Sequence, residues 1–511
     1  MNKKIWFWVK GTFKKRFNTL TRNQICALLN SLKSDKLIMP KKLRYLSGIT
    51  IYLLITILLI ENTVFAQKSK IALINRFAAA KHKYHNFNGN ILVAEKGRIV
   101  YQKSFGYADF KNKIPLTGKS VFNIASISKQ FTAAAVMLLV ERNLLSLDDP
   151  LSKFSPEIPY PNINVRQMLT HTSGLPEQNE LMFKYWNFDA PAANRDVVDF
   201  LIKYKPEAAF KPGADFQYCN TNYSLLAMIV EKVTNQKFQD FVTKNIFEPL
   251  EMKQTHFLNP QPGNYKTIAN QTENYIADKE GKKYILPEEI PEYKNALALL
   301  GLVGAGNIYS TAADLLKWQE SLKTEKILKK ESVARMKAAQ VQANVDNSDA
   351  YGFGLAIKSI YGDTRVFHYG STLGYWNSLQ HFQNADRTII VLTNNESEKG
   401  LTNAIGAILF DQKVSLPSKH KEIKLLPAEL ERFVGTYKLN GNFAFAIERR
   451  DGKLYRVTKG GEPKELKPES KTRLFYADFD RQIELVFDRK QMVKKVFFIA
   501  DGINLELKKT K

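Results

Sequence analysis

A serine and a lysine three positions apart, Ser126 and Lys129, form the first arrangement in this 511-residue sequence that could perform covalent chemistry. A serine hydroxyl is a poor nucleophile at its own pKa and needs a neighbouring base. Residues i and i+3 share one face of a helix, and burial or a nearby cation can lower a lysine pKa enough for it to act as that base. The apolar residues that follow recur at helical spacing and predict a helix from Ser126 to Asn143. The predicted chemistry is nucleophilic attack by Ser126.

Two further polar elements follow along the chain. Tyr218 and Asn220 precede a predicted helix, where a tyrosine can relay protons and an asparagine can hydrogen-bond a substrate carbonyl. His368 and Gly370 fall on a predicted strand, where the glycine would let a ligand backbone lie close and the histidine would hold a substrate carboxylate or tune Tyr218. Each pattern is weak alone, because Tyr-x-Asn occurs six times in the chain and Ser-x-x-Lys recurs at Ser418 in a polar segment.

Taken together and in this order, the three elements resemble the signature motifs of serine β-lactamases and penicillin-binding DD-peptidases. The resemblance covers roughly residues 75–410 and is closest to the class C β-lactamase and D-alanyl-D-alanine carboxypeptidase branch. It is strengthened by the surrounding segments 169–176 (LTHTSGLP), 249–252 (PLEM) and 304–315 (GAGNIYSTAADL). The chain is identified from these residues as a member of that family.

The resemblance implies catalytic roles for three residues. Ser126 looks like the acylated nucleophile, Lys129 the residue that activates it, and Tyr218 the acid/base that protonates the leaving group and helps deacylation. The backbone N–H groups of Ser126 and Ser371 would form the oxyanion hole, where one donor is typically worth about 3 kcal/mol. No cofactor and no metal is implied.

The same resemblance implies that Asn220 contacts the substrate amide and that His368, Gly370 and Ser371 line the strand against which substrate lies. The chain departs from the family at His368, where lysine is usual, and also at Tyr369, Cys219 and Glu251. Lysine offers a permanent charge to an acidic substrate, whereas histidine is largely neutral above about pH 6.5. This departure weakens the case for β-lactam hydrolysis as the physiological role but leaves the acyl-enzyme mechanism intact.

Other motifs favour structural roles or fail to support rival enzymes. His171 and the following Thr172-Ser173-Gly174 are expected to form a turn at a helix end before Pro176. No G-x-S-x-G surrounds any serine and no H-E-x-x-H occurs, so an α/β-hydrolase and a zinc peptidase lack support. The leading interpretation is a hydrolase acting on small amides or esters, plausibly D-amino-acid peptides or β-lactams. The alternatives are a penicillin-binding sensor or scaffold that is acylated without turnover, and a carboxylesterase.

The elements that must position these residues suggest an α/β (α+β) fold. Strands are predicted near both ends of the region and helices in its middle, which indicates an antiparallel sheet flanked by helices with an all-helical lobe. The stretch 176–212 is expected to be irregular, and with residues 259–293 it is expected to set specificity. The predicted helices are 71–85, 223–235, 238–246, 311–321 and 402–410, and the predicted strands are a hairpin over 89–105 and runs at 351–357, 365–369, 376–382 and 388–394.

Residues 67–412 are therefore predicted to form the hydrolase domain, 413–424 a linker and 425–511 a small all-β barrel or sandwich. Six alternating runs between 443 and 507, several separated by Asp-Gly pairs, support the last prediction. The segment Phe433–Tyr437 resembles the opening of lipocalin-like appendages in some family members. We expect this module to support or cover the catalytic domain rather than to bind a ligand.

The N-terminal region predicts export. Residues 45–60 are an apolar run preceded by three basic residues and followed by Val64-Phe65-Ala66, a pattern typical of a signal peptide over 39–66 cleaved after Ala66. The run is short for a membrane span of about 20 residues, but anchoring to the inner membrane by residues 45–60 stays the alternative to a periplasmic protein. Residues 1–38 are a basic extension, and Met39 is a possible true start.

The net charge of +25 does not by itself indicate nucleic-acid binding. Residues 1–66 contribute twelve Lys and Arg against two acidic residues, and the remaining excess is spread along the chain without a basic helix or zinc-finger spacing. The expected partners are a small-molecule or peptide substrate and cell-wall fragments rather than nucleic acid. Two cysteines, Cys26 and Cys219, leave no case for a thiolate metal site.

Overall fold

The computed structural model describes residues 67–261, 264–277, 283–397, 400–438, 444–476, 481–489 and 492–510. The predictions of a basic extension over 1–38, a signal peptide over 39–66 and an apolar anchor over 45–60 lie outside the described residues. Within the described ranges, no helix is long and apolar enough to cross a bilayer. The same ranges contain no cluster of three or more His, Cys, Asp or Glu side chains suited to a metal ion.

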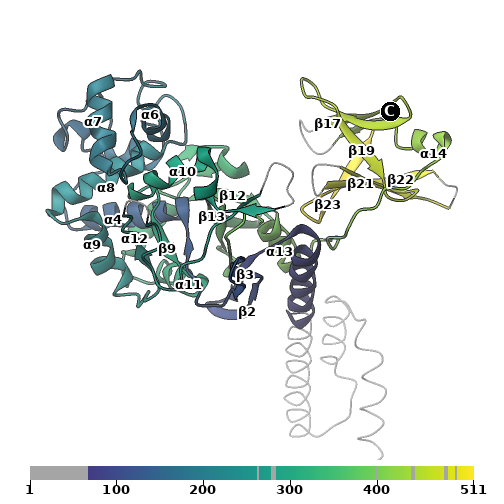
Figure 1. Ribbon diagram of the computed structural model, residues 1–511, viewed down its shortest axis with the longest axis horizontal. Helices are drawn as coiled ribbons and strands as arrows, with labels where there is room; N and C mark the ends of the chain where they lie inside the picture. Colours follow the sequence, from purple (N-terminus) through teal and green to yellow (C-terminus); the bar gives the residue numbers. More distant parts are fainter. Residues whose placement is uncertain are drawn as a thin grey trace, which may run out of the picture. The chain divides into compact units, whose positions relative to one another are not determined.

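An antiparallel eight-stranded sheet forms the centre of the hydrolase domain, in the order β10-β11-β12-β13-β14-β15-β1-β2 (Figure 1). The first hairpin pairs with the last strand of the domain through β1 and β15, so segments 300 residues apart in sequence are neighbours. The strand bounds are β1 Gly89–Glu95, β2 Arg98–Phe105, β10 Val341–Gln342, β11 Ala350–Tyr351, β12 Ala356–Ile360, β13 Asp363–Thr372, β14 Tyr375–Phe382 and β15 Arg387–Thr393. The predicted antiparallel sheet is confirmed.

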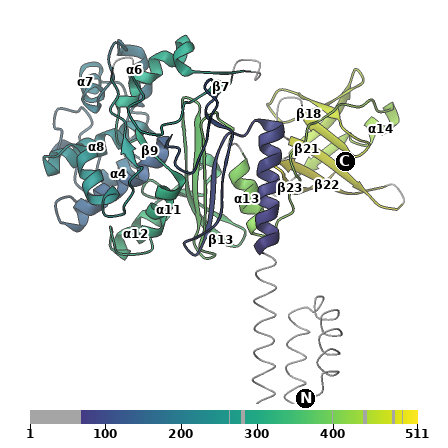
Figure 2. The ribbon, with the colours of Figure 1, turned by 60° about the horizontal axis from the view of Figure 1, so that its bottom comes forward.

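Both faces of the sheet are buried, because β1 and β15 are apolar at consecutive positions and strand side chains alternate between faces. Ile91 packs in one hydrophobic cluster with a helix over residues 67–85 and with α13 (Leu401–Leu409). Its neighbour Leu92 packs on the opposite face, in the larger cluster that includes α4 (Lys129–Glu141). Figure 2 shows α13 on one side of the sheet and α4, α8 (Asn220–Thr234) and α11 (Ala312–Ser321) on the other.

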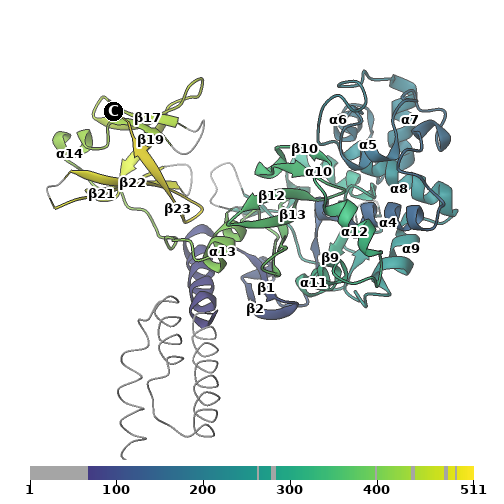
Figure 3. The same ribbon diagram turned by 180° about the vertical axis from the view of Figure 1, so that it is seen from behind.

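A lobe of helices lies beside the sheet (Figure 3) and carries several of the predicted site residues. Residues 176–212 were expected to be irregular, and that expectation is wrong for α6 and α7. Helix α7 buries Val197, Val198 and Leu201 on one face, and the Asp196 carboxylate accepts the Ala193 N–H at its start. The helices of the domain beyond α4 are α5 Val165–Leu169, α6 Gln178–Tyr185, α7 Asn194–Tyr204, α8 Asn220–Thr234, α9 Phe238–Val242, α10 Pro291–Ala298, α11 Ala312–Ser321 and α12 Lys330–Lys337.

The C-terminal module is a closed eight-stranded barrel rather than a sandwich, with each strand paired to the next and β16 closing on β23 (Figure 1). This up-and-down arrangement is the lipocalin type that the resemblance implied. Its interior is filled by apolar side chains such as Phe445, Leu474 and Phe498. The strands are β16 Gly435–Lys438, β17 Ala444–Arg450, β18 Lys453–Val457, β19 Lys464–Pro468, β20 Arg473–Tyr476, β21 Arg481–Phe487, β22 Val493–Ala500 and β23 Ile503–Lys509, of which the first and fourth were not predicted.

Candidate active site

Ser126 lies on a single 3₁₀ turn, Ala125–Ser128, that runs directly into α4. The residue before it, Ala125, has a φ of 46°, a left-handed conformation that L-residues rarely adopt and that is often found at functional sites. The Asn123 side chain accepts the Ala125 N–H at 2.9 Å, and the Asn377 side chain donates to the Asn123 carbonyl at 2.7 Å. These contacts hold the strained turn, which leaves Ser126 partly exposed at the start of the predicted helix.

The Lys129 amine is completely buried and has three polar neighbours. Its Nζ lies 3.1 Å from Ser126 Oγ, 2.8 Å from Asn220 Oδ1 and 3.0 Å from the Ala305 carbonyl oxygen. A neutral amine has two hydrogens and one lone pair, so it can donate to the two carbonyl-type oxygens and accept the serine proton. Burial lowers the pKa of Lys129 to about 7, although the Glu177 carboxylate opposes the shift. A substantial share of Lys129 is therefore neutral at neutral pH.

Tyr218 packs against this amine, with Lys129 Nζ 4.9 Å from the centre of its ring. The tyrosine hydroxyl is buried and has no hydrogen-bond partner of ordinary geometry among the described residues. Burial raises the pKa of Tyr218 well above its usual value, and the neighbouring Ser126 hydroxyl offsets only part of that rise. Tyr218 therefore keeps its proton across the physiological pH range and is equipped to donate it.

The ring of His171 packs against the ring of Tyr218. Its ring stacks on the Tyr218 ring with centres 4.4 Å apart, and its Nδ1 accepts the Cys219 N–H at 3.0 Å. Its φ of 58° fits the turn that was predicted for this segment. The stacking under Tyr218 was not predicted, because the two residues are far apart in sequence and nothing local to His171 indicates the contact.

His368 lies inside the wall of the site, with 2% of its surface exposed. Its Nδ1 is 2.6 Å from the Tyr369 carbonyl oxygen and its Nε2 is 3.0 Å from the Tyr351 hydroxyl. Because a carbonyl oxygen only accepts, Nδ1 carries the hydrogen and Tyr351 donates to Nε2. Burial and the nearby Lys129 lower the pKa of His368 to about 3. A buried, neutral ring is poorly suited to hold a substrate carboxylate, and its centre lies 6.0 Å from that of the Tyr218 ring, which favours the tuning alternative.

The strand β13 approaches the nucleophile turn closely at Gly370. A Cβ atom on this residue would lie 2.1 Å from the Ile124 carbonyl oxygen, far inside any real contact. The glycine was expected to make room for a ligand backbone; in the structure it makes room for the segment that carries Ser126. Ser371 is exposed, and β12 pairs with β13 only as far as Phe367. The end of β13 that carries Ser371 is consequently unpaired on its β12 side.

A carboxylate that the sequence analysis missed, Glu177, joins the helical lobe to this site. Its Oε2 accepts the Asn220 backbone N–H at 2.7 Å and its Oε1 accepts the Asn220 side-chain amide at 3.2 Å. Glu177 directly follows the Leu169–Pro176 motif, and that position was the only signal in the sequence.

Two adjoining cavities lie beside the end of β13, where Thr372 and Leu373 line both. The first, about 340 Å³, is lined by Ser126, Asn220 and Ser371 together with residues of α6 and α10. The second, about 380 Å³, continues past Leu300 and Leu373, which line both. About half of the residues that line the second cavity have amide or charged side chains, including Asn264, Lys266, Gln271, Glu273, Asn274, Glu288 and Lys294.

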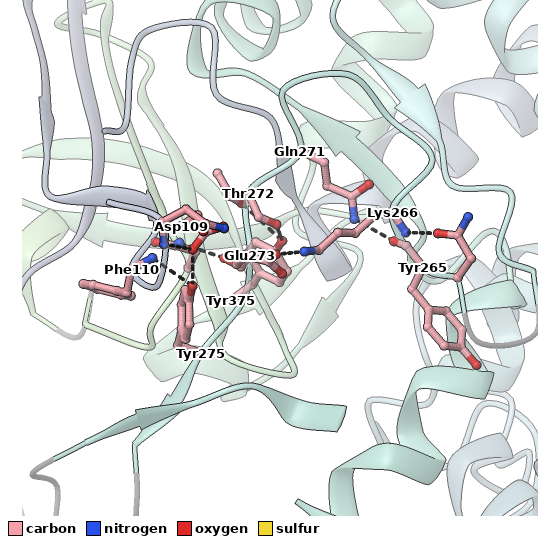
Figure 4. Close-up of polar contacts among 12 residues, drawn as sticks. Asp109, Phe110, Tyr265, Lys266, Gln271, Thr272, Glu273, Tyr275 and Tyr375 are labelled. Atoms are coloured by element: carbon pink, nitrogen blue, oxygen red, sulfur yellow. Dashed lines mark hydrogen bonds and ion pairs between the residues drawn. The ribbon is translucent and has the colours of Figure 1, made fainter. Parts of the chain in front are cut away.

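Figure 4 shows the segment 265–275, several residues of which line the second cavity. Lys266 forms an ion pair with Glu273, and Thr272 Oγ1 lies 3.2 Å from the Tyr375 hydroxyl, which in turn donates to the Thr272 carbonyl at 2.6 Å. Next to them, the Asn274 side chain donates to the Leu373 carbonyl at 2.5 Å. The segment is thus fastened to the turn that follows Ser371.

Comparisons with known proteins agree with this geometry. The family described as Beta-lactamase matches residues 73–410. Penicillin-binding protein 4* of Bacillus subtilis is 32% identical over 435 residues, covering 84% of this chain and 96% of the relative. Among solved structures, the octameric penicillin-binding protein homologue from Pyrococcus abyssi superposes with a TM-score of 0.60 at 25% identity, covering 86% of this chain and all of that one. A penicillin-binding protein from Bacillus halodurans gives 0.57 at 25% identity, covering 65% and 98%.

Proposed function

Since this chain belongs to the β-lactamase family and is a serine hydrolase of the β-lactamase and DD-peptidase type, we propose that it is exported and cleaves small amides or esters through an acyl-enzyme on Ser126. The observation that carries the proposal is the buried Lys129 amine 3.1 Å from Ser126 Oγ. We further propose D-amino-acid peptides or β-lactams as the substrate class, supported by the relatives whose names record penicillin binding.

Acylation would begin when neutral Lys129 takes the proton of Ser126 and Oγ attacks the substrate carbonyl carbon. The oxygen of the tetrahedral intermediate would be stabilised by the backbone N–H groups of Ser126 and Ser371. As the carbon–nitrogen or carbon–oxygen bond breaks, Tyr218 would give its proton to the leaving group. Protonated Lys129, beneath the Tyr218 ring, would then restore that proton, so the net transfer is from serine to leaving group. Water would hydrolyse the ester by the reverse sequence of proton transfers.

The two cavities indicate where the acyl portion of the substrate binds. Both open on the side of Ser371, and Tyr218 lines neither of them. If Tyr218 protonates the leaving group, the acyl portion must extend the other way, past Leu373 into the second cavity. The amide and charged side chains there suit a polar, peptide-like acyl chain better than an apolar one.

Steady-state turnover tests the proposal against its two rivals. A hydrolase releases p-nitrophenol from p-nitrophenyl acetate and D-alanine from a D-Ala-D-Ala peptide continuously, and the Ser126→Ala variant releases neither. A single burst of one equivalent without further turnover would instead support the acylated sensor. Continuous cleavage of the ester with no cleavage of D-amino-acid peptides would support the carboxylesterase.

Export is proposed from the N-terminal sequence, whose apolar run at residues 45–60 follows a basic flank. Cell-wall fragments would then be accessible as natural substrates. N-terminal sequencing of the protein from its native host should give Gln67 as the first residue. Recovery of residues 45–60 in a membrane fraction would instead support the anchored alternative.

A further inference from the structure

No step of the proposed mechanism uses the Glu177 carboxylate. It contacts Asn220, whose side chain also contacts Lys129. It caps its own helix by accepting the Asn179 N–H at 3.1 Å and also accepts the first N–H of α8 from Asn220. The segment that carries it is fixed, because the Thr221 hydroxyl donates to the Pro176 carbonyl at 2.6 Å and the Cys219 thiol lies 3.3 Å from the Leu175 carbonyl oxygen.

The contacts of Asn220 determine which way its amide faces. An asparagine side chain has one accepting end and one donating end. Its Nδ2 donates to Glu177, and its Oδ1 accepts from Lys129 at 2.8 Å. A carboxylate can only accept, so the reversed amide would place two oxygens against each other and turn its own hydrogens towards the lysine amine. Glu177 therefore excludes the orientation that would break the contact with Lys129.

Glu177 is also the charged member of the groups around Lys129. Cys219 and Tyr218 keep their protons because burial raises their pKa values, that of Cys219 to about 12. The two histidines that face the amine are neutral because burial lowers their pKa values, that of His368 to about 3. The titratable groups facing Lys129 are His171, Glu177, Tyr218, Cys219, Tyr223 and His368.

We propose that Glu177 is a positioning residue for acylation, which fixes the Asn220 amide and, through its negative charge, sets the pH at which Lys129 can accept the Ser126 proton. The inference rests on the proposed function for its kinetic consequence only. The effect of the negative charge on Lys129 and the fixing of the Asn220 amide can be measured separately. The charge acts at a distance, whereas the amide contacts require the full length of the glutamate side chain.

The test compares Glu177→Gln, Glu177→Asp and, as a matched control, Glu180→Gln. The last removes the same charge from an exposed position on the same helix. The pH dependence of kcat/KM for p-nitrophenyl acetate is measured from pH 5 to 9. Independently of activity, the ¹³Cε signal of Lys129, assigned with a Lys129→Met variant, is titrated by NMR.

Loss of a negative charge makes the protonated amine less favourable, so Glu177→Gln should move both the acid limb and the Lys129 titration to lower pH by about one unit. Its maximal rate should also fall by about tenfold, because the Asn220 amide is no longer held. Glu177→Asp keeps the charge, so its limb should stay near the wild-type pH while the maximal rate falls. Glu180→Gln should change neither quantity.

A purely structural role for Glu177 would lower the melting temperature of both variants and leave the acid limb and the Lys129 titration in place, which would overturn the inference. A wild-type protein that releases no p-nitrophenol would refute the proposed function, and the Lys129 titration in Glu177→Gln would still decide the role of Glu177.

Discussion

Replacing Lys129 by methionine should change how the stability of the protein depends on pH. The folded protein holds this amine at a pKa of about 7, against 10.5 in an unfolded chain. Because the folded pKa of this base is depressed, the unfolded state binds more protons between these two values, and stability rises with pH across that window. Lys129, to which we assign the role of the base, should thus destabilise the fold.

The magnitude follows from the two pKa values. One pKa unit corresponds to about 1.4 kcal/mol, so at pH 6 burying the charged amine costs about 5 kcal/mol. At pH 9 the folded amine is neutral, and the cost is that of removing the proton from an unfolded lysine, about 2 kcal/mol. The wild-type protein should therefore gain about 3 kcal/mol of unfolding free energy from this group between pH 6 and pH 9. The Lys129→Met variant lacks this pH-dependent contribution to the unfolding free energy.

Other effects of Lys129→Met are the same at pH 6 and pH 9, so they cancel when the two pH values are compared. Methionine leaves Asn220 Oδ1 and the Ala305 carbonyl without the lysine donor, at about 1–3 kcal/mol each, but this cost does not depend on pH. The assay is urea unfolding of both proteins at pH 6 and pH 9. It is followed by the fluorescence of tryptophan, because Trp318 is fully buried in the hydrolase domain and no tryptophan occurs after Trp376. If the unfolding free energies of the two proteins differ by the same amount at both pH values, within about 1 kcal/mol, the folded protein does not hold the pKa of Lys129 near 7.

Three further outcomes are expected. His368→Gln should leave the acid limb of p-nitrophenyl acetate hydrolysis near pH 7, because His368 is neutral there; a shifted limb in a pH–rate profile would show that His368 titrates in this range. Gly370→Ala should lower kcat/KM about 100-fold or more and destabilise the domain by about 1–3 kcal/mol, because its Cβ would displace the Ser126 turn. The control is Gly118→Ala, whose Cβ would meet only the end of the Gln102 side chain. Equal activities of the two variants would show that Gly370 does not set the position of the Ser126 turn. Leu300→Trp should narrow the passage between the cavities and lower kcat/KM about tenfold for peptides with long acyl chains but not for p-nitrophenyl acetate, as measured by parallel steady-state assays; equal losses for both substrates would show that acyl chains do not enter the second cavity.

The features that the sequence predicted well are those whose signal is local. Ser126 and Lys129 are one helical turn apart, so their contact follows from spacing alone. The short, continuous apolar runs of β1 and β15 likewise identify strands without reference to their partners. In the barrel, β19 was missed because its residues Lys464–Pro468 bury little beyond Leu466, which leaves no apolar alternation to recognise.

The contacts that the sequence did not predict join residues far apart in the chain. Glu177 reaches Asn220 across 43 positions, and the carbonyl that Gly370 accommodates belongs to Ile124. His368 was expected to face the substrate because a lysine usually occupies that place in the family, yet its ring bonds to Tyr351 inside the wall. Such packing depends on how the lobe and the sheet meet, which residue types and spacing do not encode.

The proposed mechanism requires that Ser126 forms a covalent acyl-enzyme with the help of Lys129. Intact-mass spectrometry of the protein after brief exposure to a fluorescent penicillin and to p-nitrophenyl acetate tests this requirement, with peptide mapping of any adduct. We expect a mass increase of one acyl group on Ser126 in the wild type, and none in Ser126→Ala or Lys129→Met. An adduct on another residue, or unchanged labelling of Ser126→Ala, would contradict it.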